Sequence, residues 1–428
     1  MKKLVAAALA VASVVTLMSC SKASKAKEDG KVLNVYVWND EFSARFNNYF
    51  PASKLGDVKV NFVQTPNADN AYQNKLDEVL LKQEKAAADD KVDIFLVEAD
   101  YALKYVDTPY TLDVKKDIGL TDEDLANQFK YTKDIMTDSK GVLKGVSWQG
   151  CPGGFIYRRS YAKEVLRTDD PAAVQKAIND WASFDSVAAK MKAAGYYMLS
   201  GYDDAFRVFS DNVTSPWVKG NKIVIDDQIK AWVKQTKEYT SKGYNNKASL
   251  WSAESTQGMM KDGKVFGYFA PAWFIDFCMP HDEGSAFGDW AFCKGPQGFS
   301  WGGTWLCGAA GSDNVALIKE VMKVLTCDTD VMAKLAMEMG DFANNSVAMQ
   351  KVATSDYKND FLGGQNHVAL FIDSAASIKK ECMSMYDQGM NEKLQSSMKD
   401  YFEGLISEDE AWNNFYTAVL EIYPNLSK

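Results

Sequence analysis

The stretch LNVYVWNDE, residues 33–41, decides the fold. In its first five residues, aliphatic side chains alternate with Asn34 and Tyr36, and β-forming residues are frequent. This pattern predicts a strand over 33–37. Behind the stretch, Phe42, Phe46 and Tyr49 recur at steps of three and four, the spacing of one helix face. A strand that leads directly into an amphipathic helix is therefore predicted.

The same pattern recurs further along the chain. Residues 58–63 predict a second strand, and the nearly continuous apolar run 92–97 predicts a third, of the kind buried in parallel sheets. Between them, Tyr72 and Leu76 mark the inner face of another helix. The alternation of strands and helices predicts an α/β fold with a parallel open sheet and right-handed crossovers.

Polar and aromatic side chains collect where these three strands end. One such cluster alone could equally cap a helix or form a turn. Ligands of open parallel sheets bind outside the carboxyl ends of the strands, so three clusters at one edge favour a binding site. Its predicted residues are Trp38, Asn39 and Glu41 after the first strand, Gln64 with Asn67 after the second, and Glu98, Asp100 and Tyr101 after the third.

A glycine-rich aromatic stretch, GFSWGGTWLCG at residues 298–308, predicts one wall of the ligand cleft. Aromatic rings offer flat apolar faces, and glycines let a backbone approach those faces closely. We expect a turn that holds Trp301 and Gly302 in the cleft, then a short strand and an amphipathic helix with Ser312 as its N-cap. The alternative is a glycine-rich loop with one buried tryptophan.

The middle of the chain repeats the arrangement of a strand with an aromatic or acidic residue at its tip. The predicted elements are strands at 155–157, 196–199 and 265–269 and a helix over 174–192. Asp203 and Trp273 follow two of these strands and are predicted to face the ligand. The chain is expected to cross between two domains at 145–150, which includes Gln149, and again near 341–344.

The N-terminus predicts export and lipidation. Residues 1–19 have the charged start and short apolar run of a signal peptide, followed at once by Cys20, the bacterial lipoprotein pattern. Residues 20–30 are small and charged, which predicts a flexible lipidated tether. The alternative is a soluble export signal with an incidental cysteine. No later segment is apolar enough to predict a membrane span.

Composition bounds the function. A chain of 428 residues with 46% hydrophobic residues is long enough for two domains, and its net charge of −9, with no basic tract, argues against nucleic-acid binding. Two histidines without zinc-ligand spacing, no Cys-x-x-Cys and no Gly-x-Ser-x-Gly give no sign of a metal, a cofactor or a serine hydrolase. Six cysteines besides Cys20 are compatible with disulfides or with buried free thiols.

Together these features resemble family 1 extracellular solute-binding proteins, the lipoprotein receptors of carbohydrate-uptake ABC importers, which include maltose-binding proteins. The resemblance is carried by the lipoprotein motif ending at Cys20 and by VYVWNDEF (35–42), DIFLVE (93–98), GVSW (145–148), GGFIYR (153–158) and WGG (301–303). It implies a monomeric binding protein without enzymatic activity, held in the cell envelope, with a sugar ligand and permease subunits as partners. It further implies two α/β lobes closing at a hinge, 31–146 with 297–345 and 147–296 with 346–428.

Sugar binding suits the predicted residues, because tryptophan rings stack on the apolar face of a sugar and carboxylates and amides bind its hydroxyls. A polyamine receptor of the same fold remains an alternative, with Glu41, Glu98, Asp100 and Asp203 as partners for ammonium groups. A glycosidase using two carboxyl groups is a further alternative. Tyr196-Tyr197 is similar to the paired tyrosines of ferric-binding proteins, but neighbouring residues in a strand face opposite sides.

Overall fold

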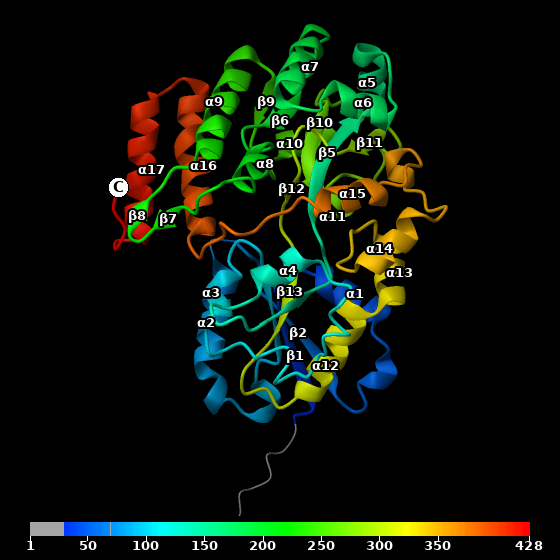
Figure 1. Cartoon of the computed structure of the whole chain (residues 1–428), viewed down its shortest axis with the longest axis vertical. Coiled ribbons are helices and arrows are strands. Elements are labelled where there is room, and N and C mark those ends of the chain that lie inside the picture. Colours follow the sequence, from blue (N-terminus) through cyan, green and yellow to red (C-terminus); the bar gives the residue numbers. More distant parts are fainter. Residues whose placement is uncertain (1–29, 69) are drawn as a thin grey trace, which may run out of the picture.

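The computed structural model describes residues 30–68 and 70–428, which form two bodies stacked on one another (Figure 1). The predicted signal peptide, Cys20 and the tether up to residue 29 lie outside the described residues. The first body, the lower one in Figure 1, is built on a five-stranded sheet of order β2-β1-β3-β13-β4. Its strands are β1 (Val32–Val37), β2 (Lys59–Gln64), β3 (Ile94–Glu98), β4 (Val146–Ser147) and β13 (Thr304–Gly308).

The predicted strand and helix order of the first body is confirmed. β1 pairs in parallel with both β2 and β3, whereas β13 runs antiparallel to β3 and β4. The crossover helices are α1 (Glu41–Tyr49) and α2 (Ala71–Lys82). Each buries the aromatic stripe that the sequence indicates, because residues three and four apart share one helix face. The carboxyl ends of β1 and β3 therefore face the second body.

The second body is built around β5 (Pro152–Arg158), which pairs antiparallel with β10 (Gly267–Pro271), β11 (Trp290–Cys293) and β12 (Phe299–Ser300). Gly153 and Gly154 lie directly under the rings of Phe299 and Phe292, where a Cβ atom would come within 2.3 and 2.2 Å of ring carbons. Two small sheets complete the strands, β6 (Leu199–Gly201) with β9 (Asn245–Ala248) and β7 (Val218–Lys219) with β8 (Lys222–Ile223).

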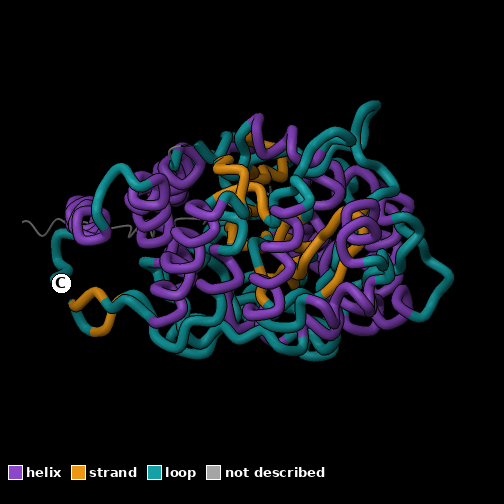
Figure 2. The backbone as a smooth tube through the Cα atoms, turned by 90° about the horizontal axis from the view of Figure 1, so that it is seen from above, coloured by secondary structure: helices purple, strands orange, loops and turns teal. Residues whose placement is uncertain are grey.

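Helices enclose the two larger sheets, and seen from above most of the strands lie inside them, whereas the β7–β8 hairpin lies at the edge near the C-terminus (Figure 2). The remaining α-helices are α3 (Leu103–Val106), α4 (Lys130–Ile135), α5 (Arg159–Leu166), α6 (Pro171–Ala177), α7 (Trp181–Ala193), α8 (Phe206–Ser210), α9 (Asp227–Lys242), α10 (Ala253–Met259), α11 (Ala272–Phe277), α12 (Val315–Met322), α13 (Thr329–Met339), α14 (Ser346–Ala353), α15 (Val368–Ala375), α16 (Asp387–Glu403) and α17 (Glu408–Ile422). Short helical turns cover Ala52–Lys54, Gln83–Lys85, Ala88–Asp90 and Asp360–Leu362, and Lys323–Cys327 is a π-helix.

Three local predictions need correction. The helix expected over 174–192 is two helices, because Asp180 breaks the run and caps α7 by accepting a hydrogen bond from the Ser183 amide at 2.7 Å. The strand expected over 196–199 begins only at Leu199. Ser312 does not cap the next helix, since its hydroxyl donates to Asp93 Oδ1 at 2.5 Å and α12 begins at Val315.

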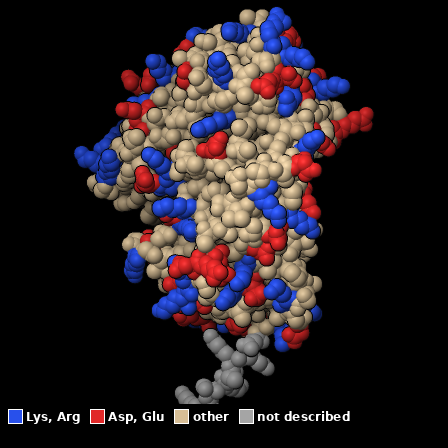
Figure 3. Space-filling model, turned by 45° about the vertical axis from the view of Figure 1, so that its right-hand side comes forward, with Lys and Arg blue, Asp and Glu red and all other residues tan. Residues whose placement is uncertain are grey.

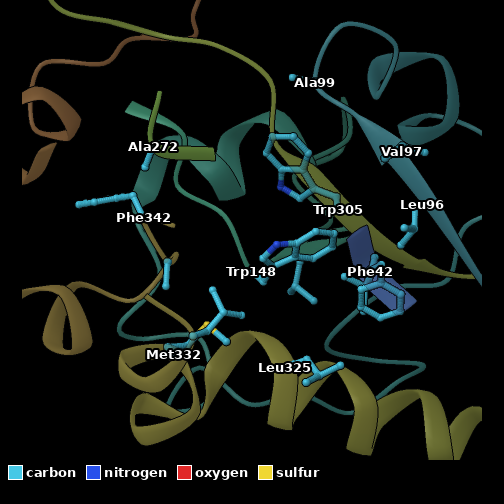
Figure 4. Packing of buried hydrophobic residues seen from close by; sticks show 14 of the residues in the cluster. Phe42, Leu96, Val97, Ala99, Trp148, Ala272, Trp305, Leu325, Met332 and Phe342 are labelled. Atoms are coloured by element: carbon cyan, nitrogen blue, oxygen red, sulfur yellow. The ribbon is translucent and has the colours of Figure 1, made fainter. Parts of the chain in front are cut away.

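Tryptophans fill the core of the first body. Trp148 and Trp305 are fully buried, and Phe42 packs 5.3 Å from the Trp148 ring (Figure 4). Trp305 Nε1 donates to the carbonyl oxygen of Thr132 at 2.9 Å, which satisfies its one polar atom. Both rings therefore belong to the hydrophobic core.

Three chain segments connect the two bodies, and they lie side by side. Gln149 and Ala343 form an antiparallel bridge, flanked by hydrogen bonds from the Gly150 amide to the Phe342 carbonyl and from the Asn344 amide to the Trp148 carbonyl, both 2.8 Å long. The third segment joins them where the Trp301 amide donates to the Cys151 carbonyl at 3.2 Å. The paired residues 148–150 and 342–344 thus form one narrow backbone ribbon, called the crossing ribbon below.

Charged side chains of both signs are interspersed on the face shown in Figure 3. Across the described residues, none of the helices combines the length and apolar character that a membrane crossing requires.

Candidate ligand-binding cleft

A cavity of about 460 Å³ lies between the two bodies, at the strand ends of both sheets. All of the predicted ligand-binding residues line it except Gln64: Trp38, Asn39, Glu41, Glu98, Asp100, Tyr101, Gln149, Asp203, Trp273, Trp301 and Gly302. Its size falls in the range of small-molecule sites.

Gln64 does not reach this cavity. It ends β2, which is the edge strand of the sheet, and its side chain is exposed. Asn67, three residues further on, lines the cavity instead. Of the two polar residues predicted after the second strand, only Asn67 lines the cavity, because the chain needs the residues after Gln64 to turn back from the border of the sheet.

Half-buried tryptophans give the cavity its apolar faces. Trp38 meets Tyr72 and Tyr101 edge-on, with ring centroids 5.4 and 6.2 Å apart. Trp273 meets Trp301 edge-on at 5.0 Å, and its Nε1 donates to the Trp301 carbonyl oxygen at 3.1 Å. These ring contacts hold each indole in place, and all three side chains remain partly exposed.

Glycines shape the turn that carries Trp301. Gly302 and Gly303 have φ angles of +73° and +109°, values that other residues adopt only with strain. The turn carries the chain from β12 of the second body to β13 of the first, and both strands run antiparallel to the neighbouring β4–β5 segment. The glycine pair therefore places the Trp301 ring at the boundary between the two bodies.

Arg207 on α8 and Asp100 after β3 form an ion pair across the cleft. Nη1 donates to Oδ1 at 2.7 Å and Nη2 to Oδ2 at 2.6 Å. The guanidinium also lies 5.7 Å from the centroid of Trp301. Burial alone would raise the pKa of Asp100, but the charge of Arg207 and its hydrogen bonds lower it overall, so Asp100 is ionised.

The pKa of Glu98 is shifted in the opposite direction to that of Asp100. Its Oε2 accepts a hydrogen bond from the Asp100 amide at 2.7 Å, and burial together with the neighbouring Asp100 charge raises its pKa to about 8. Both effects favour the protonated form of Glu98, which can donate a hydrogen bond. Beside it, the buried hydroxyl of Tyr101 has no hydrogen-bond partner among the described residues, and both groups line the cavity.

A buried network links the cleft to the crossing ribbon. Arg45 Nη2 lies 3.1 Å from Glu41 Oε1 and 3.0 Å from Asp341 Oδ2. Gln149 Nε2 donates to the same two carboxylates, at 2.7 and 3.1 Å. Burial raises the pKa of Glu41, and Arg45 offsets part of that effect. The network ties α1 to both crossing segments.

Several lining residues were not foreseen. Arg207 and Trp251 sit on loops and a short helix whose sequences carry no strand-tip pattern. Gln388, Glu392 and Gln395 line the cavity from α16, and their spacing of four and three marks one polar helix face that inspection of the sequence could have found.

Chemically, the cleft offers aromatic faces and hydrogen-bonding groups. Among residues 30–68 and 70–428 no group of three or more His, Cys, Asp or Glu side chains is placed to hold a metal ion. The six cysteines of this part of the chain are free thiols, three of them buried, so the structure contains none of the disulfides that the sequence left open.

Comparison with solved structures identifies the architecture. A crystal structure of an extracellular solute-binding protein of family 1 has a TM-score of 0.76 at 18% identity, covering 91% of this chain and 99% of the other. The galacto-N-biose-/lacto-N-biose I-binding protein of an ABC transporter from Bifidobacterium longum, solved with lacto-N-biose, has a TM-score of 0.69 at 16% identity, covering 94% of this chain and all of the other.

A third similar structure is the sugar-binding protein MalE from Xanthomonas citri, with a TM-score of 0.68 at 15% identity, covering 92% of this chain and 97% of the other. Curated protein sequences give no match. The expected two-lobed α/β architecture of solute-binding proteins is thereby confirmed. The family model described as bacterial extracellular solute-binding protein matches residues 42–362, well over half of the chain, and the protein belongs to this family.

Proposed function

We propose that the cleft captures a sugar or oligosaccharide and that the protein delivers it to the permease subunits of an ABC importer. The observation that carries this proposal is the set of half-buried tryptophans, Trp38, Trp273 and Trp301, that line a cavity rimmed with carboxyl and amide groups. Such rings suit the C–H face of a pyranose, and the polar groups suit its hydroxyls. Binding proteins for lacto-N-biose and for β-1,6-galactobiose among the similar structures support the same class of ligand.

A polyamine ligand fits less well, because the cleft carboxylates are already engaged. Asp100 is paired with Arg207 and Glu41 with Arg45. Glu98 is protonated at neutral pH, and Asp203 accepts a hydrogen bond from the Leu250 amide at 3.2 Å. To pair with Asp100 or Glu41, an ammonium group would have to displace Arg207 or Arg45 from its carboxylate.

A glycosidase is also less well supported. It needs a protonated and an ionised carboxyl group flanking the scissile bond. Glu98 and Asp100 have these two protonation states, but they lie on one short turn, and both Asp100 oxygens are occupied by Arg207. That arrangement suits the binding of hydroxyl groups better than attack on a sugar carbon.

We further propose that the lobes 31–146 with 297–345 and 147–296 with 346–428 close over the ligand about the crossing ribbon. The paired backbone of residues 148–150 and 342–344 is narrow enough to bend while each lobe keeps its own sheet. Closure would bring the Trp38 side of the first lobe against the Trp273 side of the second. Closure would then exclude water from both faces of the sugar ring and so contribute to the binding energy.

We also propose that the protein is a monomer anchored by lipid on Cys20 at the outer face of a membrane, in the periplasm or at the cell surface; the signal-peptide pattern ending at Cys20 supports the anchoring. The lobes would then face the permease within reach of the tether. A lone chemoreceptor or adhesin would use the same binding cleft without the permease.

A thermal-shift screen tests the proposed ligand class. The full chain is melted with mono-, di- and trisaccharides and, in parallel, with putrescine and spermidine. A ligand at a hundred times its Kd stabilises the native state by about 2.7 kcal/mol. We expect a saccharide to raise Tm and the amines to leave it unchanged; a rise with the amines alone would contradict the proposal.

A further inference from the structure

Two exposed aromatic side chains stand at the mouth of the cleft. Trp251 is 63% and Phe277 is 55% exposed, and both line the cavity. A contiguous exposed apolar patch rimmed by polar groups is typical of a ligand-binding groove, whereas single exposed apolar side chains are common on any surface. Phe287, which is 51% exposed, does not line the cavity and provides an internal comparison.

The backbone holds Trp251 in an unusual conformation. Its φ angle is +69°, a genuine outlier for a bulky residue. Its neighbours fix it on both sides: the Leu250 amide donates to Asp203 Oδ2 at 3.2 Å, and the Ser252 hydroxyl accepts from the Ser255 amide at 3.2 Å at the start of α10. Strain that the surroundings maintain is typical of ligand clamps.

Trp251 extends the aromatic lining of the cleft outward. Its ring centroid lies 5.9 Å from that of Trp301 and 6.2 Å from that of Phe274. Phe277 lies four residues after Trp273 on α11, on the same helix face. The second body thus presents ring contacts from the half-buried Trp273 through Trp301 to the exposed Trp251, and Phe277 lines the same cavity.

We propose that Trp251 and Phe277 form an outer subsite, which binds a second sugar ring beyond the ring held between the inner tryptophans. The ligand class is therefore an oligosaccharide of at least two units. This inference rests on the proposed sugar-binding function. An indole whose faces are mostly in water contributes little to the core, whereas an outer sugar unit would cover it and be positioned by it.

The test compares sugars of increasing length. Glucose, maltose and maltotriose, and in parallel galactose and β-1,6-galactobiose, are titrated into the full chain and into Trp251→Gly, Trp251→Phe and Phe287→Ala. Glycine suits the positive φ, so it removes the ring and relieves the strain together. Phe287→Ala is the matched control for removal of an exposed aromatic ring.

We expect the wild type to bind a di- or trisaccharide at least tenfold more tightly than the corresponding monosaccharide. Trp251→Gly should remove most of that difference and leave monosaccharide binding within about twofold, while Trp251→Phe and Phe287→Ala keep it. Equal losses for short and long sugars, no loss in Trp251→Gly, or a wild type that prefers the monosaccharide would overturn the subsite. A wild type that binds no saccharide would overturn the proposed function, and the subsite with it.

Discussion

Arg207 donates two parallel hydrogen bonds to Asp100, at 2.7 and 2.6 Å, and thereby joins a helix of the second lobe to the turn after β3 of the first. Both side chains are 23% exposed, so water reaches the pair without separating it. Paired guanidinium and carboxylate groups of this geometry fix orientation as well as charge. The pair also stands between the main cavity and a second one of about 560 Å³ that shares Trp301 and Gly302.

Removing one member of this pair should destabilise the protein. In Arg207→Met, Asp100 keeps its charge but loses its partner, and we expect the free energy of unfolding to fall by about 1–3 kcal/mol. Urea denaturation measures it. Lys230→Met, which breaks an exposed pair with Asp227, is the control and should change stability by less than about 0.5 kcal/mol. Equal stability of Arg207→Met and the wild type would show that the pair contributes nothing to the fold.

The protonated state of Glu98 predicts a pH dependence. Burial and the neighbouring Asp100 charge raise its folded-state pKa from 4.5 to about 8. Between these values the folded protein holds a proton that the unfolded chain has released, so this group makes stability fall as pH rises from about 4.5 to 8.

Glu98→Gln removes that contribution and keeps a hydrogen-bond donor at the site. Relative to the wild type it should gain on the order of 4 kcal/mol of stability between pH 5 and pH 8.5, measured by denaturation at both values. Glu254→Gln replaces an exposed carboxylate, and its stability should change with pH in the same way as that of the wild type. If the stability of Glu98→Gln also changes with pH as that of the wild type does, the pKa of Glu98 lies near its ordinary value.

The network around Arg45 should contribute strongly to stability. Arg45 is only 6% exposed and lies within 3.1 Å of both Glu41 and Asp341. Arg45→Met leaves two buried carboxylates unpaired, and we expect a loss of about 3–5 kcal/mol at pH 8. The loss should shrink at pH 5, where burial already favours protonation of Glu41.

The control for Arg45 is Lys334→Met, which removes an exposed partner of Glu338 at 3.8 Å. It should alter the free energy of unfolding by less than about 0.5 kcal/mol at either pH. A pH-independent loss in Arg45→Met would mean that lost packing, rather than unpaired charge, is responsible.

The anchor prediction concerns Cys20. If this cysteine is lipidated, Cys20→Ala should release the protein from the membrane fraction and abolish labelling with a fatty-acid precursor. Ser19→Ala leaves the acceptor thiol in place and should retain both properties. A membrane-bound wild type that takes up no label would refute lipidation at this position.

The sequence predicted most reliably those residues that directly follow a strand with a clear hydrophobic pattern. The strands ending at Trp38 and Glu98 could be predicted because alternation and apolar runs define them, and parallel pairing then brings their ends to one edge. The same logic predicts Asp203 and Trp273 as ligand residues, and both line the cavity. Gln64 does not line the cavity, because β2 is the edge strand of the sheet and its end lies beside solvent rather than over the cleft.

Residues positioned by tertiary contacts escaped prediction. Arg207 gains its role only because α8 of the second lobe faces Asp100 across the cleft, a contact between residues that are far apart in the chain. Trp251 depends on a positive φ angle that hydrophobic periodicity does not encode. The break at Asp180 was missed because its capping hydrogen bond competes with an otherwise continuous helical pattern.

The central claim is that the exposed tryptophan faces of the cleft bind a sugar. Trp38 and Trp301 are half-buried and line the cavity, whereas Trp305 is 2% exposed and belongs to the core. Replacing a core tryptophan with alanine costs about 3–5 kcal/mol of stability. Trp305→Ala is therefore the matched control for a structural role.

The most direct measurement is calorimetric titration of the best saccharide from the thermal-shift screen into the wild type, Trp301→Ala and Trp38→Ala. We predict that each cleft variant melts within about 4 °C of the wild type and binds about a hundredfold more weakly, a loss of about 2.7 kcal/mol. Unchanged affinity with normal melting, or a collapse in melting temperature like that of Trp305→Ala, would contradict the claim.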